Sequence, residues 1–164
     1  MHARIELREL DRLSARRLCQ IRRLSISDRQ IEYGGSFETS VDDCIAGSPD
    51  SIRGLAILLK DTPIGLVVLK RPPLSPVWAS EDTVTLHGLK IDARWQGKGY
   101  GKAAFVRTLA VCRTIWPDAK RMALSVDADN AVALALYKSL GMIDSGSVFQ
   151  GRIGLEHRLH IALD

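Results

Sequence analysis

The stretch ARWQGKGYGKAAF, residues 93–105, constrains the fold most, because glycine stands at Gly97, Gly99 and Gly101 and is then absent until Gly141. The residues before it, TVTLHGLKID, read as a strand, and those after it favour a helix. A glycine-rich turn between a strand and a helix brings the backbone close to a ligand. Its free N–H groups and the helix dipole favour an anion. We therefore expect a phosphate-binding loop.

The rest of the chain alternates between strand and helix patterns. We expect strands over residues 3–9, two within the hairpin 55–70, and others over 83–92, 122–126, 143–150 and 153–163. We expect helices over residues 11–26, 40–47, 100–115 and 130–140. The order is β-α-α-β-β-β-α-β-α-β-β, which predicts an α/β fold with a mixed, largely antiparallel sheet flanked by helices.

Size and composition indicate one globular domain over residues 1–164, with 46% hydrophobic and 26% charged residues. The cysteines, Cys19, Cys44 and Cys112, are far apart and form no metal-binding or disulfide pattern, so we expect no metal and a reducing, cytoplasmic location. No apolar run approaches the ~18 residues of a membrane span, and the N-terminus lacks a signal-peptide core, so no membrane partner is expected.

The mild basic excess, a net charge of +4, lies partly in the arginines of residues 16–23. On a helix these arginines would be spread over a solvated surface, and no aromatic residues are interleaved with them as in an RNA-binding platform. Nucleic acid is therefore an unfavoured partner. The sequence leaves the oligomeric state open, a homodimer included.

Two common phosphate loops do not fit the glycine stretch. The Rossmann pattern needs a glycine where Lys102 stands, and the Walker pattern needs a glycine at Gln96 and a hydroxyl at Ala103. What remains is Q-x-x-G-x-G, from Gln96 to Gly101, preceded by the strand residues LKI.

This motif resembles motif A of the GNAT superfamily of acetyl-CoA-dependent N-acetyltransferases. A second region is also similar to that family: the strand MALSV is followed by Asn130, Tyr137 and the LGM of residues 140–142. The expected element order is the family's order as well. The resemblance implies the GNAT fold and transfer of an acetyl group from acetyl-CoA to a primary amine by direct attack.

The resemblance also implies a cofactor site. The loop N–H groups would bind the pyrophosphate of coenzyme A, the strand before the loop would offer backbone groups to the pantetheine arm, and Lys98, Lys102 and Lys138 could pair with phosphates. The expected cofactor-binding residues are Leu89, Lys90, Ile91, Gln96, Gly97, Lys98, Gly99, Tyr100, Gly101, Lys102, Asn130 and Tyr137.

Acetyl transfer asks for a free amine, an oxyanion stabiliser and an acid for the leaving thiolate. Asn130 and Tyr137 are seven residues apart, so they share a helix face, and the resemblance makes Tyr137 the general acid. His87 is the candidate base because imidazole titrates near neutral pH, with Glu32 and Glu81 as other candidates. Cys112 fits a buried structural role better than a nucleophile.

The acceptor is the least determined part. Gln30, Tyr33 and Ser40 lie in a segment that resembles bacterial polyamine acetyltransferases of the spermine/spermidine type. Several acidic residues lie in segments expected to border the amine, and Glu32 and Glu81 are the candidate substrate-binding residues. The alternatives are a protein N-terminal or lysine acetyltransferase and a non-catalytic acyl-CoA-binding module.

Overall fold

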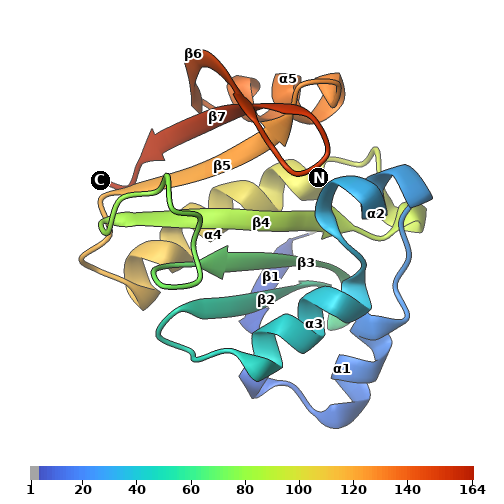
Figure 1. Ribbon diagram of the computed structural model, residues 1–164. Helices are drawn as coiled ribbons and strands as arrows, with labels where there is room; N and C mark the ends of the chain where they lie inside the picture. Colours follow the sequence, from blue (N-terminus) through green and yellow to red (C-terminus); the bar gives the residue numbers. More distant parts are fainter. Residues whose placement is uncertain (1–3) are drawn as a thin grey trace.

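The computed structural model describes residues 4–164 and contains one seven-stranded sheet in the order β1-β2-β3-β4-β5-β7-β6 (Figure 1). The strands are β1 (Ile5–Glu9), β2 (Ile52–Leu59), β3 (Thr62–Lys70), β4 (Thr83–Ile91), β5 (Arg121–Asp127), β6 (Ile143–Gln150) and β7 (Leu155–Ala162). Within the described chain β4 and β5 form the one parallel pair, and the other pairs are antiparallel. The mixed, largely antiparallel sheet is confirmed.

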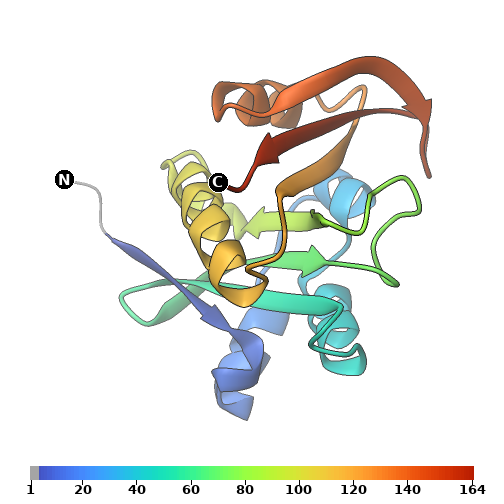
Figure 2. The same ribbon diagram turned by 90° about the vertical axis from the view of Figure 1, so that its left-hand side faces the viewer.

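Helices cover both faces of the sheet. They are α1 (Ala15–Arg22), α2 (Asp28–Gly34), α3 (Phe37–Ala46), α4 (Tyr100–Ile115) and α5 (Ala131–Ser139), with short 3-10 turns at Leu10–Arg12 and Ala93–Trp95. Helix α4 lies on one side of the sheet and the pair α2 and α3 on the other (Figure 2). No helix in residues 4–164 has the length and apolar character that crossing a membrane requires.

The helix expected over residues 11–26 is present but shorter than expected. Helix α1 begins only after Ser14, whose hydroxyl accepts from the Arg17 N–H, and it ends at Arg22. A separate helix, α2, then begins after Ser27, which forms a capping box with Gln30. Helix α2 was not predicted from the sequence. Serine at a helix N-cap satisfies backbone N–H groups that would otherwise have no partner, so each serine allows a new start.

The next helix also begins earlier than expected. Ser36, not Ser40, is the N-cap of α3, and its hydroxyl accepts from the Thr39 N–H. Ser40 lies inside the helix, where its hydroxyl is available for another partner.

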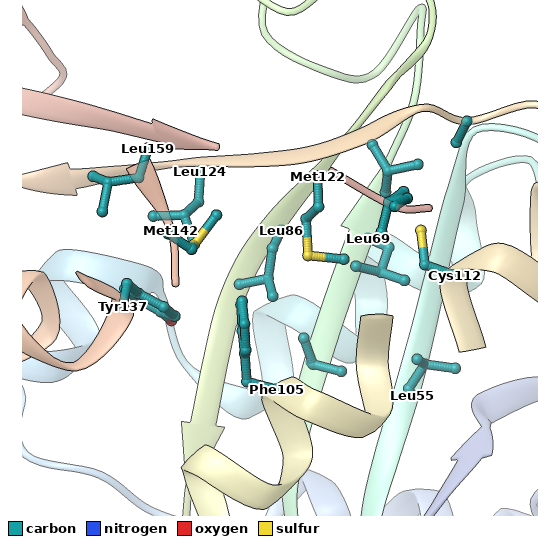
Figure 3. Close-up of a cluster of buried hydrophobic side chains, with 14 of the residues drawn as sticks. Leu55, Leu69, Leu86, Phe105, Cys112, Met122, Leu124, Tyr137, Met142 and Leu159 are labelled. Carbon is teal, nitrogen blue, oxygen red and sulfur yellow. The ribbon is translucent and has the colours of Figure 1, made fainter. Parts of the chain in front are cut away.

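Strand alternation divides the core between the two faces. Leu69, Leu86, Met122 and Leu124 point toward α4 and α5, where they pack with Phe105 in the largest buried cluster (Figure 3). On the other face, apolar residues of β2 and β3 pack against α1 and α3. The opposite face of β4, β5 and β7 carries polar side chains instead.

Cys112 is fully buried in the larger cluster, and this burial raises the pKa of its thiol to about 11. A thiol with that pKa is protonated and unreactive at neutral pH. This supports the structural role expected for Cys112.

Candidate active site

Strands β4 and β5 separate along their length. Their pairing covers only Thr83–Thr85 with Arg121–Ala123, although β4 continues to Ile91 and β5 to Asp127. Beyond the paired part the two strands diverge (Figure 1). The facing backbone edges beyond Thr85 and Ala123 can therefore bind an extended ligand. Leu89, Lys90 and Ile91, the residues expected to flank the pantetheine arm, lie on this part of β4.

The glycine loop follows directly at the end of β4. Gly97 and Gly99 have φ angles of 74° and 85°, in the left-handed region that favours glycine. A Cβ atom built on either residue would meet no heavy atom within 4 Å. Gly99 is the N-cap of the 16-residue helix α4 and supplies no side-chain cap. The first N–H groups of α4 therefore have no side-chain cap from Gly99, which leaves them suited to an anion.

Gln96 holds this loop in place. Its Nε2 donates to the Ile91 carbonyl at 2.8 Å and to Oε1 of Gln30 at 3.2 Å. The first bond ties the loop to β4, and the second ties it to α2. Gln30, one of the residues behind the polyamine resemblance, is thus engaged with the loop and with the α2 capping box.

The charged and aromatic residues of the loop are grouped at its surface. Lys98 Nζ lies 6.0 Å from the ring centroid of Trp95, which contacts Tyr100 edge-on at 6.3 Å. Lys98 and Lys102 are exposed beside the loop and stay available to an anion. Lys138 instead pairs with Asp144 at 3.4 Å.

Tyr137 lies on α5, where it is buried beside Phe105 with ring centroids 5.6 Å apart (Figure 3). Burial raises the pKa of its hydroxyl to about 12, so it stays protonated at neutral pH. No described residue forms a hydrogen bond with this hydroxyl. Asn130, two turns earlier, is the N-cap of α5 and accepts from the Ala133 N–H at 3.4 Å.

A pocket of about 410 Å³ opens on the opposite face of the sheet; we call it the α2 pocket. Helices α2 and α3 form one wall, and β3, β4, β5 and the β6–β7 loop supply the rest. Its charged and polar side chains come from all of these elements: Glu32, Tyr33, Ser40, Asp43, Lys70, His87, Ser125 and Arg152. Two carboxylates and two permanent cations thus line the same pocket.

His87 lies on the floor of the α2 pocket. Its Nε2 is 2.7 Å from the Thr85 hydroxyl, which in turn donates to the Lys70 carbonyl at 3.4 Å. We assign the ring proton to Nε2 and the lone pair to Nδ1, because the Thr85 hydroxyl has one proton and the Lys70 carbonyl can only accept it. Burial, together with the charges of Lys70 and Lys90, lowers the pKa of His87 to about 4. The imidazole is therefore neutral at physiological pH.

Lys90 sends its side chain to the wall of this pocket and not to the loop. Its Nζ donates to the Ser40 hydroxyl at 2.7 Å and to the Gly34 carbonyl at 3.2 Å. Burial lowers its pKa to about 8. Of the residues expected to bind the cofactor, Lys90 can do so only through its backbone, because its side chain holds α2 and α3 against β4.

The two candidate substrate-binding glutamates lie far apart in the fold. Glu32 lines the α2 pocket, and its carbonyl accepts a hydrogen bond from Arg152. Glu81 lies in the 71–82 loop before β4, where its carbonyl accepts from Arg71, and it does not line the α2 pocket.

Several lining residues of the α2 pocket were not predicted from the sequence, among them Lys70, Gly88, Ser125 and Arg152. Ser125 offered a signal, since it is a polar residue in an apolar strand, MALSV, and must face away from the core. The other three are brought to the pocket by sheet register and by the β6–β7 loop, which no local pattern encodes.

The model of the Acetyltransferase (GNAT) family matches residues 18–142 of this chain. A spermidine N-acetyltransferase from Vibrio cholerae, solved with CoA and spermine, is similar over 99% of this chain and 97% of its own, with a TM-score of 0.74 and 22% identity. The aminoglycoside acetyltransferase AAC(6')-Ib, solved with coenzyme A, has a TM-score of 0.75 and 17% identity, covering 97% of this chain and 95% of its own. No curated protein sequence matches the chain significantly.

Proposed function

The chain belongs to the GNAT acetyltransferase family, and we propose that it transfers the acetyl group of acetyl-CoA to a primary amine of a small molecule by direct attack. One observation carries the proposal: the opening between β4 and β5 has the glycine loop at its end, Tyr137 on one face and the α2 pocket on the other. Two reactants can thus approach one point from opposite faces of the sheet, which is the geometry that direct transfer needs.

On the donor side, different residues bind different parts of acetyl-CoA. The N–H groups from Gly97 to Lys102 and the start of α4 bind the pyrophosphate, assisted by Lys98 and Lys102. The free edge of β4 from Leu89 to Ile91 orients the pantetheine arm. Tyr137, protonated because burial raises its pKa to about 12, donates a proton to the leaving sulfur.

On the acceptor side, His87 holds the attacking amine or a water that relays its proton. An imidazole whose pKa is about 4 is a weak base. It therefore assists the amine as a neutral hydrogen-bond acceptor and does not first remove a proton from an ammonium ion. Glu32 and Asp43, which also line the α2 pocket, can accept hydrogen bonds from the acceptor's amine.

The polyamine interpretation rests on the sequence pattern and on these two carboxylates, and it stays a prediction, as do a homodimer and a cytoplasmic location. The V. cholerae enzyme named above was solved with spermine, which is consistent with a long cationic acceptor. Glu81 has no place in this acceptor site, so Glu32 is the glutamate to vary.

A panel of small amines, incubated with acetyl-CoA, tests the proposal through release of free thiol. We expect amine-dependent release with at least one small amine and none with protein termini alone. Tight acetyl-CoA binding without release for any amine would instead support a non-catalytic acyl-CoA-binding module.

A further inference from the structure

A second pocket, of about 270 Å³, lies on the same face of the sheet as the α2 pocket; we call it the Trp78 pocket. The 71–82 loop, which crosses in front of the sheet in Figure 1, covers it on one side. Three basic side chains line it, Arg121, Arg158 and His160, with three hydroxyls, Ser80, Thr83 and Ser145. None of its ten described lining residues is acidic.

Arg158 is held in place largely by aromatic rings. Its guanidinium carbon is 3.8 Å from the ring centroid of Phe149 and 4.8 Å from that of Trp78. Its Nε forms an ion pair with Glu156 at 3.5 Å, and no described residue accepts a hydrogen bond from its two terminal nitrogens. A guanidinium that lies against two aromatic rings and keeps the donors of its terminal nitrogens free can bind an anion through those donors.

Arg121 lies across the pocket and is exposed, and no described carboxylate pairs with it within 4 Å. The nearby carboxylate of Asp82 accepts from the Ser80 hydroxyl at 2.6 Å. Hydrogen bonding from Ser80 and the charges of Arg121 and Lys120 lower the pKa of Asp82, as expected beside excess positive charge. The pocket therefore favours negative charge.

The two pockets adjoin along the sheet. Ser125, which lines the α2 pocket, stands directly opposite Arg158 in the β5–β7 pair. Thr83 in the Trp78 pocket and His87 in the α2 pocket lie on the same face of β4, four residues apart, which is about 13 Å along a strand. One molecule of moderate length can therefore reach both pockets.

We propose that the amine acceptor carries an anionic group, a carboxylate or a phosphate, which binds in the Trp78 pocket while its amine enters the α2 pocket. This inference rests on the proposed acetyl transfer and replaces the polyamine interpretation of the acceptor. Lys70 and Arg152 in the α2 pocket agree with it, because they balance Glu32 and Asp43 and leave no excess of negative charge for a polycation. A second ammonium group in the Trp78 pocket would meet like charges, which is costly.

Four acceptors of equal chain length test this: a diamine, an alkylamine and two anionic acceptors, an ω-amino carboxylate and an ω-aminoalkyl phosphate. We expect kcat/KM to be highest for one of the two anionic acceptors. Arg121→Gln should raise the KM of that acceptor about 10-fold or more and leave the KM of the alkylamine unchanged. The matched control is Arg16→Gln, which removes an exposed charge from α1 and should change neither.

Calorimetry with coenzyme A present measures the affinity for the preferred anionic acceptor without turnover. Arg121→Gln should lower this affinity. The proposal is overturned if the diamine is the best acceptor, or if Arg121→Gln affects all acceptors alike. It is also overturned if a free carboxylate stimulates alkylamine acetylation without competing with the amino carboxylate, since the anion would then be a separate effector. If no amine leads to thiol release but calorimetry still detects binding of the anionic acceptor, the result counts against the proposed function instead.

Discussion

The two candidate catalytic side chains, Tyr137 and His87, are kept uncharged because their pKa values are shifted in opposite directions. Burial raises the pKa of Tyr137 to about 12, and burial with two nearby lysines lowers the pKa of His87 to about 4. Between these values neither group changes its charge. At the scale of single residues, the site is therefore built around a neutral phenol on one face of the sheet and a neutral imidazole on the other.

Removing the Tyr137 hydroxyl tests its role as an acid. Tyr137→Phe keeps the ring beside Phe105, and kcat should fall by roughly 10²- to 10⁴-fold with coenzyme A affinity unchanged. Because no described residue bonds to this hydroxyl, the melting temperature should change little. Ser139→Ala is the control: it removes an exposed hydroxyl of the same helix, which donates to the Leu136 carbonyl, so it should leave kcat within a few-fold. Equal kcat in Tyr137→Phe and the wild type, with chemistry rate-limiting, would exclude the role.

The shift of His87 predicts two pH effects. Because its pKa falls from 6.5 in the unfolded chain to about 4 in the folded one, the folded state disfavours its protonation. Its contribution to stability is fully present above pH 6.5 and is lost as the pH falls toward 4, by on the order of 3 kcal/mol at most. Denaturant unfolding should show that the free energy of unfolding falls less between pH 6.5 and pH 4 in His87→Gln than in the wild type.

The activity profile provides the second effect. As the pH rises, kcat/KM should increase with the neutral fraction of the amine. The pH profile should show no inflection near pH 6.5, because His87 is already neutral there. An inflection near pH 6.5 that disappears in His87→Gln would show that the imidazole keeps its ordinary pKa in the working enzyme.

At the scale of elements, the glycine loop and α4 form the donor site, and glycine at position 99 is required by its φ of 85°. Gly99→Ala should weaken coenzyme A binding at least 10-fold, because strain shifts the N–H groups that bind the pyrophosphate. Gly146→Ala is a matched control, with a φ of 80° and no heavy atom within 4 Å of an added Cβ. Each variant should lose about 1 kcal/mol of stability, but calorimetry should detect weaker binding only in Gly99→Ala.

The elements also show what the sequence could predict. All seven strands, α4 and α5 follow from local apolar patterns and from glycines at defined places, and these elements carry the donor site. Helix α2 escaped prediction because it is seven residues long, has no buried residue and depends on the Ser27–Gln30 capping box. The α2 pocket was only partly predictable, since Lys70, Ser125 and Arg152 meet through register and a loop, which are consequences of the whole fold.

At the scale of the whole molecule, the sheet consists of two parts, β1–β4 and β5–β7, joined through a parallel pairing of three residues on each strand. A ligand bound in the opening between β4 and β5 would connect the two parts. Coenzyme A should therefore slow amide hydrogen exchange in residues 86–91 and 124–127 and leave the paired β1–β2 amides unchanged. Unchanged exchange in both β4 and β5 at saturating coenzyme A would place the ligand elsewhere.

The central claim is that one opening in the sheet brings an acetyl donor and an amine together from opposite faces. Its most direct test is mass spectrometry of the amine after incubation with acetyl-CoA, alongside initial rates for the wild type, Tyr137→Phe and Gly99→Ala. The account predicts one added acetyl group on the amine, with Tyr137→Phe slowed at saturating acetyl-CoA and Gly99→Ala rescued by higher acetyl-CoA. Thiol release without any acetylated amine would contradict it, because the chain would then hydrolyse the thioester and not transfer its acetyl group.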